Sequence, residues 1–88
     1  MKIKDGFVLR CIADEYVVIP VGNSFANSRI MLALNDTAAF IWKKLIDGTD
    51  IQSIAIALCE EYDLTYENAI QDITQFCKEL DKRNMLGE

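Results

Sequence analysis

The side chains that most often do chemistry in a small domain are histidine, cysteine and paired carboxylates, and this sequence offers few of them. It has no histidine, so the commonest general base and the commonest zinc ligand are both missing. Its three cysteines, Cys11, Cys59 and Cys77, stand far apart, and no two of them have the spacing of a metal or redox motif. We therefore expect three reduced, mostly buried thiols in a cytoplasmic protein, with no metal or other cofactor.

The carboxylates are equally uninformative about catalysis. Glu60, Glu61 and Asp63 cluster near the end of a predicted helix, but their spacing is helical and lacks the pattern of a calcium-binding loop. A solvated helix face explains them better. The sequence also has no glycine-rich phosphate loop, no nucleophile elbow and no Ser/His/Asp arrangement. These observations predict that the protein is not an enzyme.

Length and charge favour a binding module. The chain has 88 residues, of which 51% are hydrophobic and 26% charged, as is typical of one small globular domain spanning residues 1–88. Its formal net charge of -5 leaves no basic footprint for a nucleic acid, so we expect no nucleic-acid partner. The sequence has no apolar stretch long enough to span a membrane.

Three strands are predicted between residues 7 and 34. Residues 7–12 and 15–21 form a hairpin around Ala13 and Asp14, with Pro20 near a strand end because proline cannot donate to a ladder. Residues 28–34 form the third strand, and its large aliphatic side chains alternate toward one face. The strands should make an antiparallel sheet with exposed edges.

Three helices are predicted to follow. Asn35 caps a helix over 36–46, which ends at Asp47 and Gly48. Trp42 lies on its apolar stripe and is therefore expected in the core. A second helix starts after Thr49, in a capping box with Gln52, and stops near 63–64. Thr65 caps a third helix over 66–83. The fold class is α+β, resembling a winged helix-turn-helix, with a three-stranded antiparallel sheet followed by three helices.

The junction between sheet and helices carries a family resemblance. The stretch LNDTAAFIW at 34–42, followed by Leu45 and Gly48, resembles the PqqD family pattern Leu-Asn-x-Thr-Gly-Ala-x-Ile-Trp with a later Leu and Gly. The segment YVVIPVG at 16–22 is similar to that family's second strand, and the rhythm of the last two helices fits as well. Two features depart from the pattern: Ala38, where the family often has glycine, and a short loop between the second and third strands.

The resemblance implies a free-standing RiPP precursor peptide recognition element, a winged helix-turn-helix that binds peptides instead of DNA. In that family the leader segment of a ribosomally made precursor peptide adds as a strand to the edge of the third strand and lies against the third helix. The domain is a non-catalytic chaperone that presents the peptide to a modifying enzyme, typically a radical SAM protein, in the biosynthesis of PQQ or of another peptide product.

Carried onto this sequence, the resemblance places peptide contacts at the edge of the third strand and along one flank of the third helix. Arg29 is the best candidate to meet an acidic leader residue. For Ile73 and Cys77 a place in the core is at least as good an explanation, and the sequence leaves open which helix flank faces the peptide. The expected peptide-binding residues are Arg29, Ile30, Met31, Leu32, Ala33, Ile70, Ile73, Thr74 and Cys77.

Two other functions stay open at this point. One is an acidic winged-helix transcriptional regulator, although acidic side chains along the third helix oppose phosphate over much of its length. The other is an adaptor for a different modification system. The sequence also leaves open which peptide and pathway are served, and whether the unpaired strand edge binds a second copy of the chain.

Overall fold

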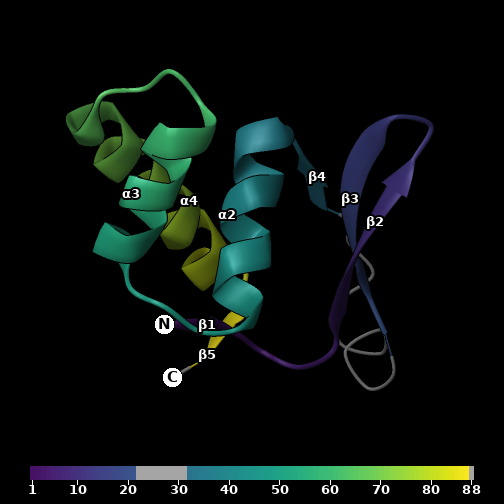
Figure 1. The fold of residues 1–88 in the computed structure, drawn as a ribbon. Helices are drawn as coiled ribbons and strands as arrows, with labels where there is room; N and C mark the ends of the chain where they lie inside the picture. Colours follow the sequence, from purple (N-terminus) through teal and green to yellow (C-terminus); the bar gives the residue numbers. More distant parts are fainter. Residues whose placement is uncertain (22–31, 88) are drawn as a thin grey trace.

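The computed structural model describes residues 1–21 and 32–87. Its described elements are two short strands at the ends of the chain, three strands in one sheet, and three helices. Figure 1 shows α3 and α4 on one side of the molecule, the three-stranded sheet on the other, and α2 between them. The α+β class predicted from the sequence is confirmed, and the arrangement is winged-helix-like.

The sheet is built on a tight hairpin. Strand β2 (Phe7–Ile12) pairs antiparallel with β3 (Glu15–Pro20), and the turn residues Ala13 and Asp14 have φ of 51° and 65°. Two successive positive φ values are typical of the two-residue turns whose twist matches that of paired strands. Pro20 ends β3, as predicted. Strand β4 (Leu32–Leu34) pairs antiparallel with the other side of β3, which gives the order β2-β3-β4.

The junction after β4 folds as the sequence predicts. Helix α2 (Asp36–Ile46) starts at Asn35, whose side-chain oxygen accepts a hydrogen bond of 2.8 Å from the backbone N–H of Ala38. The helix ends at Asp47, and Gly48 follows with φ of 84°, a left-handed conformation that glycine adopts without strain. The predicted bounds of this helix are confirmed.

One predicted cap is wrong. Helix α3 (Ile51–Glu61) is capped by Asp50, whose carboxylate accepts a hydrogen bond of 2.7 Å from the N–H of Ser53, and Thr49 lies one residue outside the cap. The same bond lowers the pKa of the Asp50 carboxyl. Aspartate and threonine both cap helices well, so residue type alone does not show which of the two is the cap. Because the helix starts at Ile51, the cap is Asp50. Helix α4 (Tyr66–Lys82) is capped by Thr65 as predicted.

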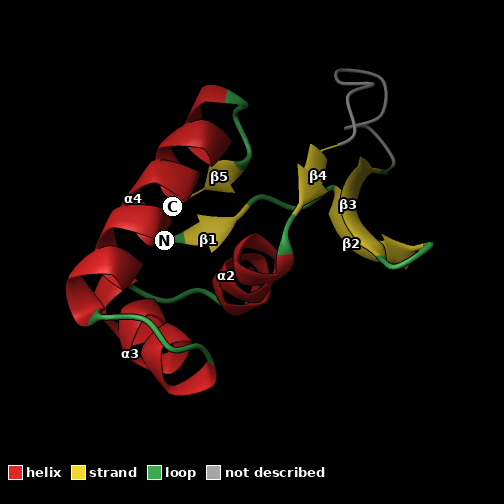
Figure 2. Ribbon diagram, turned by 90° about the horizontal axis from the view of Figure 1, so that it is seen from above, coloured by secondary structure: helices red, strands yellow, loops and turns green. Residues whose placement is uncertain are grey.

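The two ends of the chain pair with each other, which the sequence did not indicate. Strand β1 (Lys2–Ile3) runs antiparallel to β5 (Leu86–Gly87), with Ile3 opposite Leu86. Figure 2 shows this two-stranded sheet between α4 and α2, apart from the three-stranded sheet. Met85 is buried beside it, so the C-terminal segment returns to the core after α4.

All three helices and both sheets contribute to one hydrophobic core. Trp42, Leu45, Leu58 and Leu80 are fully buried within it. Helix α2 carries four of the core residues and lies between the three-stranded sheet and the α3–α4 pair (Figure 2). The prediction that Trp42 belongs to the core is confirmed.

The three cysteines are free thiols in different surroundings, and we expect them to react with iodoacetamide in a fixed order. Cys11 is exposed, Cys59 is half-buried and Cys77 is buried, with its sulfur 3.3 Å from that of Met1. The expectation of buried thiols is therefore wrong for Cys11, which lies on β2 near the exposed hairpin turn. Burial raises the pKa of the Cys77 thiol, which reduces the thiolate that attacks the reagent. Peptide mass spectrometry of timed samples at pH 8 should show Cys11 modified first and Cys77 last.

Unfolding provides the control for this order, because in urea the three thiols should react at similar rates. If Cys77 in the native protein were alkylated as fast as Cys11, the Cys77 side chain would not be protected by burial in the folded state.

Candidate functional site

The edge of the three-stranded sheet is the first part of the candidate site. Within the described residues, β4 is an outer strand, and only its β3 side is paired. Leu34 is buried and Leu32 half-buried on the core side, whereas Ala33 is exposed on the opposite face. The predicted contacts Arg29, Ile30 and Met31 lie outside the described residues.

A groove between α2 and α4 is the second part. It has a volume of about 440 Å³ and begins at Asn35, the residue that directly follows β4. We call it the α2–α4 groove. One wall comes from the cap and first turns of α2 and the other from the middle of α4; its lining residues are Asn35, Thr37, Ala38, Ile41, Asp72, Gln75, Phe76 and Glu79.

The α2–α4 groove has an apolar floor and a polar rim. Ile41 is 2% exposed, while Ala38 and Phe76 are half-buried, so their hydrocarbon surface forms the floor. Asp72 and Glu79 are exposed on the α4 rim. This combination of apolar anchoring surface and a few polar groups is typical of binding sites.

Asn35 fixes the corner where the strand edge meets the groove. Its side-chain oxygen accepts hydrogen bonds from the Ala38 N–H at 2.8 Å and from the Thr37 hydroxyl at 3.0 Å. Both donors belong to residues that line the groove. One side chain therefore ends the strand, starts the helix and sets the position of the groove wall.

A second hollow, of about 470 Å³, lies on the other side of Asn35. It is lined by Tyr16 of β3 together with Ala33 and Leu34 of β4, and by the acidic residues Asp14, Glu15 and Asp36. Tyr16 pairs directly with Leu34, so the strand edge on this side is already occupied by β3. A further strand can add to β4 only on the side opposite β3.

The predicted helix contacts do not line the α2–α4 groove. Ile73 is fully buried and Cys77 is 6% exposed, and both face the core. Ile70 and Thr74 lie together in a separate hollow of about 340 Å³ on the surface of α4. Of the nine predicted positions, Ala33 and Leu32 are at the described strand edge, and none of the four on α4 lines the groove beside it.

Helix geometry explains this outcome. Successive helix residues are about 100° apart around the axis, so Asp72 and Phe76 fall on one side of the buried stripe of α4, and Ile70 and Thr74 on the other. The groove uses the flank with Asp72 and Phe76. Phe76 is absent from the contacts expected from the sequence, because its helical spacing from Ile73 and Leu80 is that of a core residue. Its half-buried position places it at the border of that stripe.

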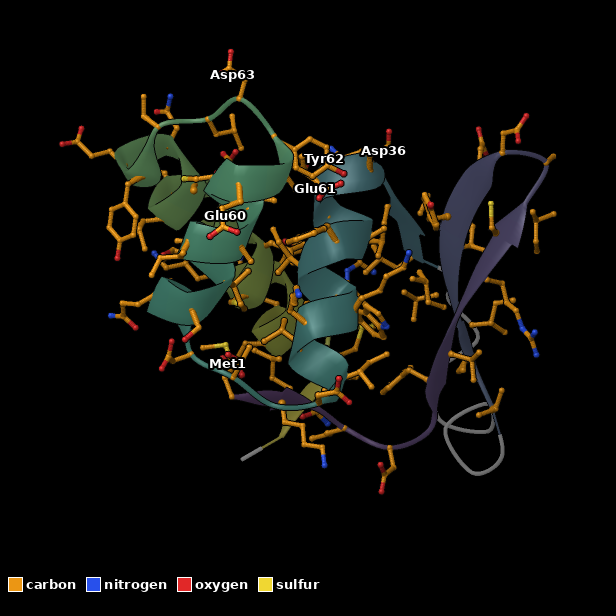
Figure 3. The ribbon with its side chains drawn as sticks, in the orientation of Figure 1. Met1, Asp36, Glu60, Glu61, Tyr62 and Asp63 are labelled. Atoms are coloured by element: carbon orange, nitrogen blue, oxygen red, sulfur yellow. The ribbon has the colours of Figure 1, made fainter. Side chains whose placement is uncertain are left out.

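The acidic cluster near the end of α3 is a solvated face. Glu60, Glu61 and Asp63 are all exposed, and Figure 3 shows Asp63 pointing outward while Tyr62 turns toward Asp36 at the start of α2. The Tyr62 hydroxyl lies 3.5 Å from the backbone carbonyl of Asp36. Within residues 1–21 and 32–87, no three His, Cys, Asp or Glu side chains gather in a way that could hold a metal ion.

Phe40 of α2 is half-buried beside the end of α3. Its ring meets Tyr62 edge to face, with centroids 5.9 Å apart, and the Lys44 ammonium lies 5.3 Å from its centroid. Such contacts tie α2 to the end of α3. Phe40 therefore holds helices together and is not a free interface aromatic.

Comparison with known proteins assigns a family to most of the chain. Residues 15–86 match the family model described as coenzyme PQQ synthesis protein D (PqqD). This range begins at β3 and ends at β5, so it includes the strand edge, the Asn35 corner and the α2–α4 groove. No curated protein sequence matches the chain.

Two solved structures share the fold. The first is of TbiB1 in complex with the TbiA(beta) leader peptide: it is 27% identical, has a TM-score of 0.77, and the match covers 98% of this chain and 94% of that chain. The second is of lasso peptide synthetase B1 complexed with the leader peptide, at 24% identity and a TM-score of 0.75, covering 96% and 93%. The arrangement of strands and helices described above is therefore that of proteins solved with leader peptides.

Proposed function

This chain belongs to the PqqD family, and we propose that it is a RiPP recognition element that binds the leader segment of a ribosomally made precursor peptide. The observation that carries the proposal is the position of β4, an edge strand that ends beside the α2–α4 groove. An extended peptide that adds to this edge enters the groove with alternate side chains.

Strand addition suits the chemistry of the β4 edge and of the α2–α4 groove. The edge of β4 offers backbone N–H and C=O groups, which supply affinity to any extended segment independently of its sequence. The groove supplies selectivity, because alternate side chains of a strand point to the same side and only these reach Phe76, Ala38 and Ile41. The solved relatives support this assignment, since each is a complex with a leader peptide.

We further propose that the whole chain acts as one non-catalytic domain, which presents the bound peptide to a separate modifying enzyme. The family resemblance points to a radical SAM protein as that enzyme. A peptide made on ribosomes and three free thiols both fit a cytoplasmic site of action. The acidic rim of the groove disfavours the alternative of a DNA-binding regulator, because Asp72 and Glu79 would face phosphate.

Crosslinking capture in the native host tests the proposal. The full chain, carrying an affinity tag, is expected to recover a short ribosomal peptide together with a peptide-modifying enzyme, both identified by mass spectrometry. Crosslinks from the peptide should fall on β4 and on the α4 wall of the groove. Recovery of DNA-associated proteins alone would move the assignment to the regulator.

A further inference from the structure

The α2–α4 groove carries an uneven charge that bears on which peptides it accepts. Asp72 and Glu79 line its α4 wall, and the polar residues of its α2 wall, Asn35 and Thr37, are neutral. The neighbouring hollow on the other side of Asn35 is acidic as well, through Asp14, Glu15 and Asp36. A peptide that enters the α2–α4 groove would therefore pass Asp72 and Glu79, which are the charged side chains among the described residues that line it.

Among the described residues that line the α2–α4 groove, none is a lysine or an arginine. Arg83 pairs with Glu79, with the guanidinium Nε 3.3 Å from the carboxylate. On α2, the Lys43 ammonium lies 5.2 Å from the Tyr16 ring centroid and Lys44 lies over Phe40. Lys78 lines the hollow on the opposite flank of α4. Among the described residues, Asp72 makes no ion pair and is left as the charge that a ligand would meet first.

We infer that the groove selects a peptide in which a lysine or arginine sits two residues from an apolar residue, the basic side chain meeting Asp72 and the apolar one packing on Phe76. This inference rests on the proposed peptide-binding function and names the class of peptide. Arg29, which we expected to meet an acidic leader residue, lies outside the described residues.

The spacing follows from the two backbones. Asp72 and Phe76 are four residues apart on α4, a rise of about 6 Å along the helix axis. Side chains two residues apart in an extended strand lie on the same side and are about 6.6 Å apart. A strand that follows α4 therefore presents two such side chains to Asp72 and Phe76 in register. Glu79 contributes less, because Arg83 already neutralises part of its charge.

A selection from random peptides tests the inference. The probe is a display library of linear peptides of about twelve residues, which span roughly 40 Å when extended and so exceed the length of α4. We expect the wild-type chain to enrich peptides with a basic residue two positions from an apolar one. Asp72→Lys should reverse the charge preference, and Asp72→Asn should weaken it without reversal.

Glu60→Lys is the matched control, because it makes the same charge change at an exposed position on α3 outside the groove. For a single enriched peptide, Asp72→Lys should raise Kd roughly five- to twenty-fold, as expected when a partly exposed ion pair becomes a like-charge contact. Glu60→Lys should leave Kd within about twofold. Added salt should reduce the difference in Kd between Asp72→Lys and the wild type, because it screens the charges.

The selection distinguishes a failure of the charge selectivity from a failure of peptide binding itself. If the wild type and Asp72→Lys enrich the same peptides, or if the enriched peptides carry no basic residue, the charge selectivity is wrong while peptide binding stands. If no variant enriches any peptide although all are folded by circular dichroism, peptide binding itself is contradicted, and the inference with it.

Discussion

Replacing Trp42 with alanine is expected to lower the free energy of unfolding by about 3–5 kcal/mol, the range for deleting a large aromatic side chain from a core. Trp42 has 0% of its surface exposed and belongs to α2, the helix between the three-stranded sheet and the α3–α4 pair (Figure 2). A domain of this size has about 5–15 kcal/mol of stability in total. The variant should therefore unfold at much lower urea than the wild type.

Trp42→Phe separates packing from hydrogen bonding at the same position. The indole N–H of Trp42 is buried and has no hydrogen-bond partner among the described residues, and an unsatisfied donor of this kind costs about 1–3 kcal/mol. Phenylalanine removes the donor and keeps an aromatic ring, so we expect it to cost less than half as much as alanine.

Urea unfolding followed by far-UV circular dichroism measures both variants. Fluorescence cannot serve, because Trp42 is the single tryptophan of the chain. Equal losses of stability for alanine and phenylalanine would show that the ring is not the main support of the core at this position.

The sequence predicted the helical layer well because its signals are local. Asn35, Thr65 and Gly48 each act through hydrogen bonds or backbone angles within a few residues. The apolar stripes of α2 and α4 repeat over three or more turns, which is enough to identify a buried face. These elements therefore need no knowledge of the tertiary structure.

Elements fixed by distant contacts were missed. The β1–β5 pair contains two residues per strand and joins opposite ends of the chain. No periodic pattern can show in so short a segment. The cap of α3 was predicted at Thr49 instead of Asp50 for a related reason, since both residue types suit the role. The backbone N–H of Thr49 donates a hydrogen bond of 2.9 Å to the carbonyl of Met1, which is a long-range contact. The position of the N-terminal strand thus bears on where this helix begins.

The same contrast between local signals and distant contacts applies to the candidate site. The sequence predicts a site at the edge of the third strand and on the third helix, but both flanks of α4 carry a partly apolar, partly polar set of side chains. Choosing between Ile70 and Phe76 requires knowing how α4 is rotated against α2, which depends on packing throughout the core. The same packing places Ile73 and Cys77 inside.

Filling the α2–α4 groove should strongly weaken peptide binding without unfolding the protein, and Ala38→Trp is the change that fills it most directly. Ala38 is half-buried and lines the groove wall, so a large ring at this position occupies the space proposed for the peptide side chains. Its backbone N–H still reaches Asn35, because that hydrogen bond does not involve the side chain. Losing a central contact of a peptide complex costs about 2–4 kcal/mol, a roughly 30- to 900-fold rise in Kd.

Fluorescence anisotropy with a labelled copy of the captured peptide measures the change in Kd, and urea unfolding checks that stability stays within about 1 kcal/mol. Ala57→Trp is the matched control, since Ala57 is also a half-buried helix alanine but lies on α3 outside the groove. Ala38→Ser, which adds one oxygen, should bind nearly as well as the wild type. If Ala38→Trp folds and binds the peptide with unchanged affinity, the peptide does not enter the groove, and strand addition at β4 must act without it.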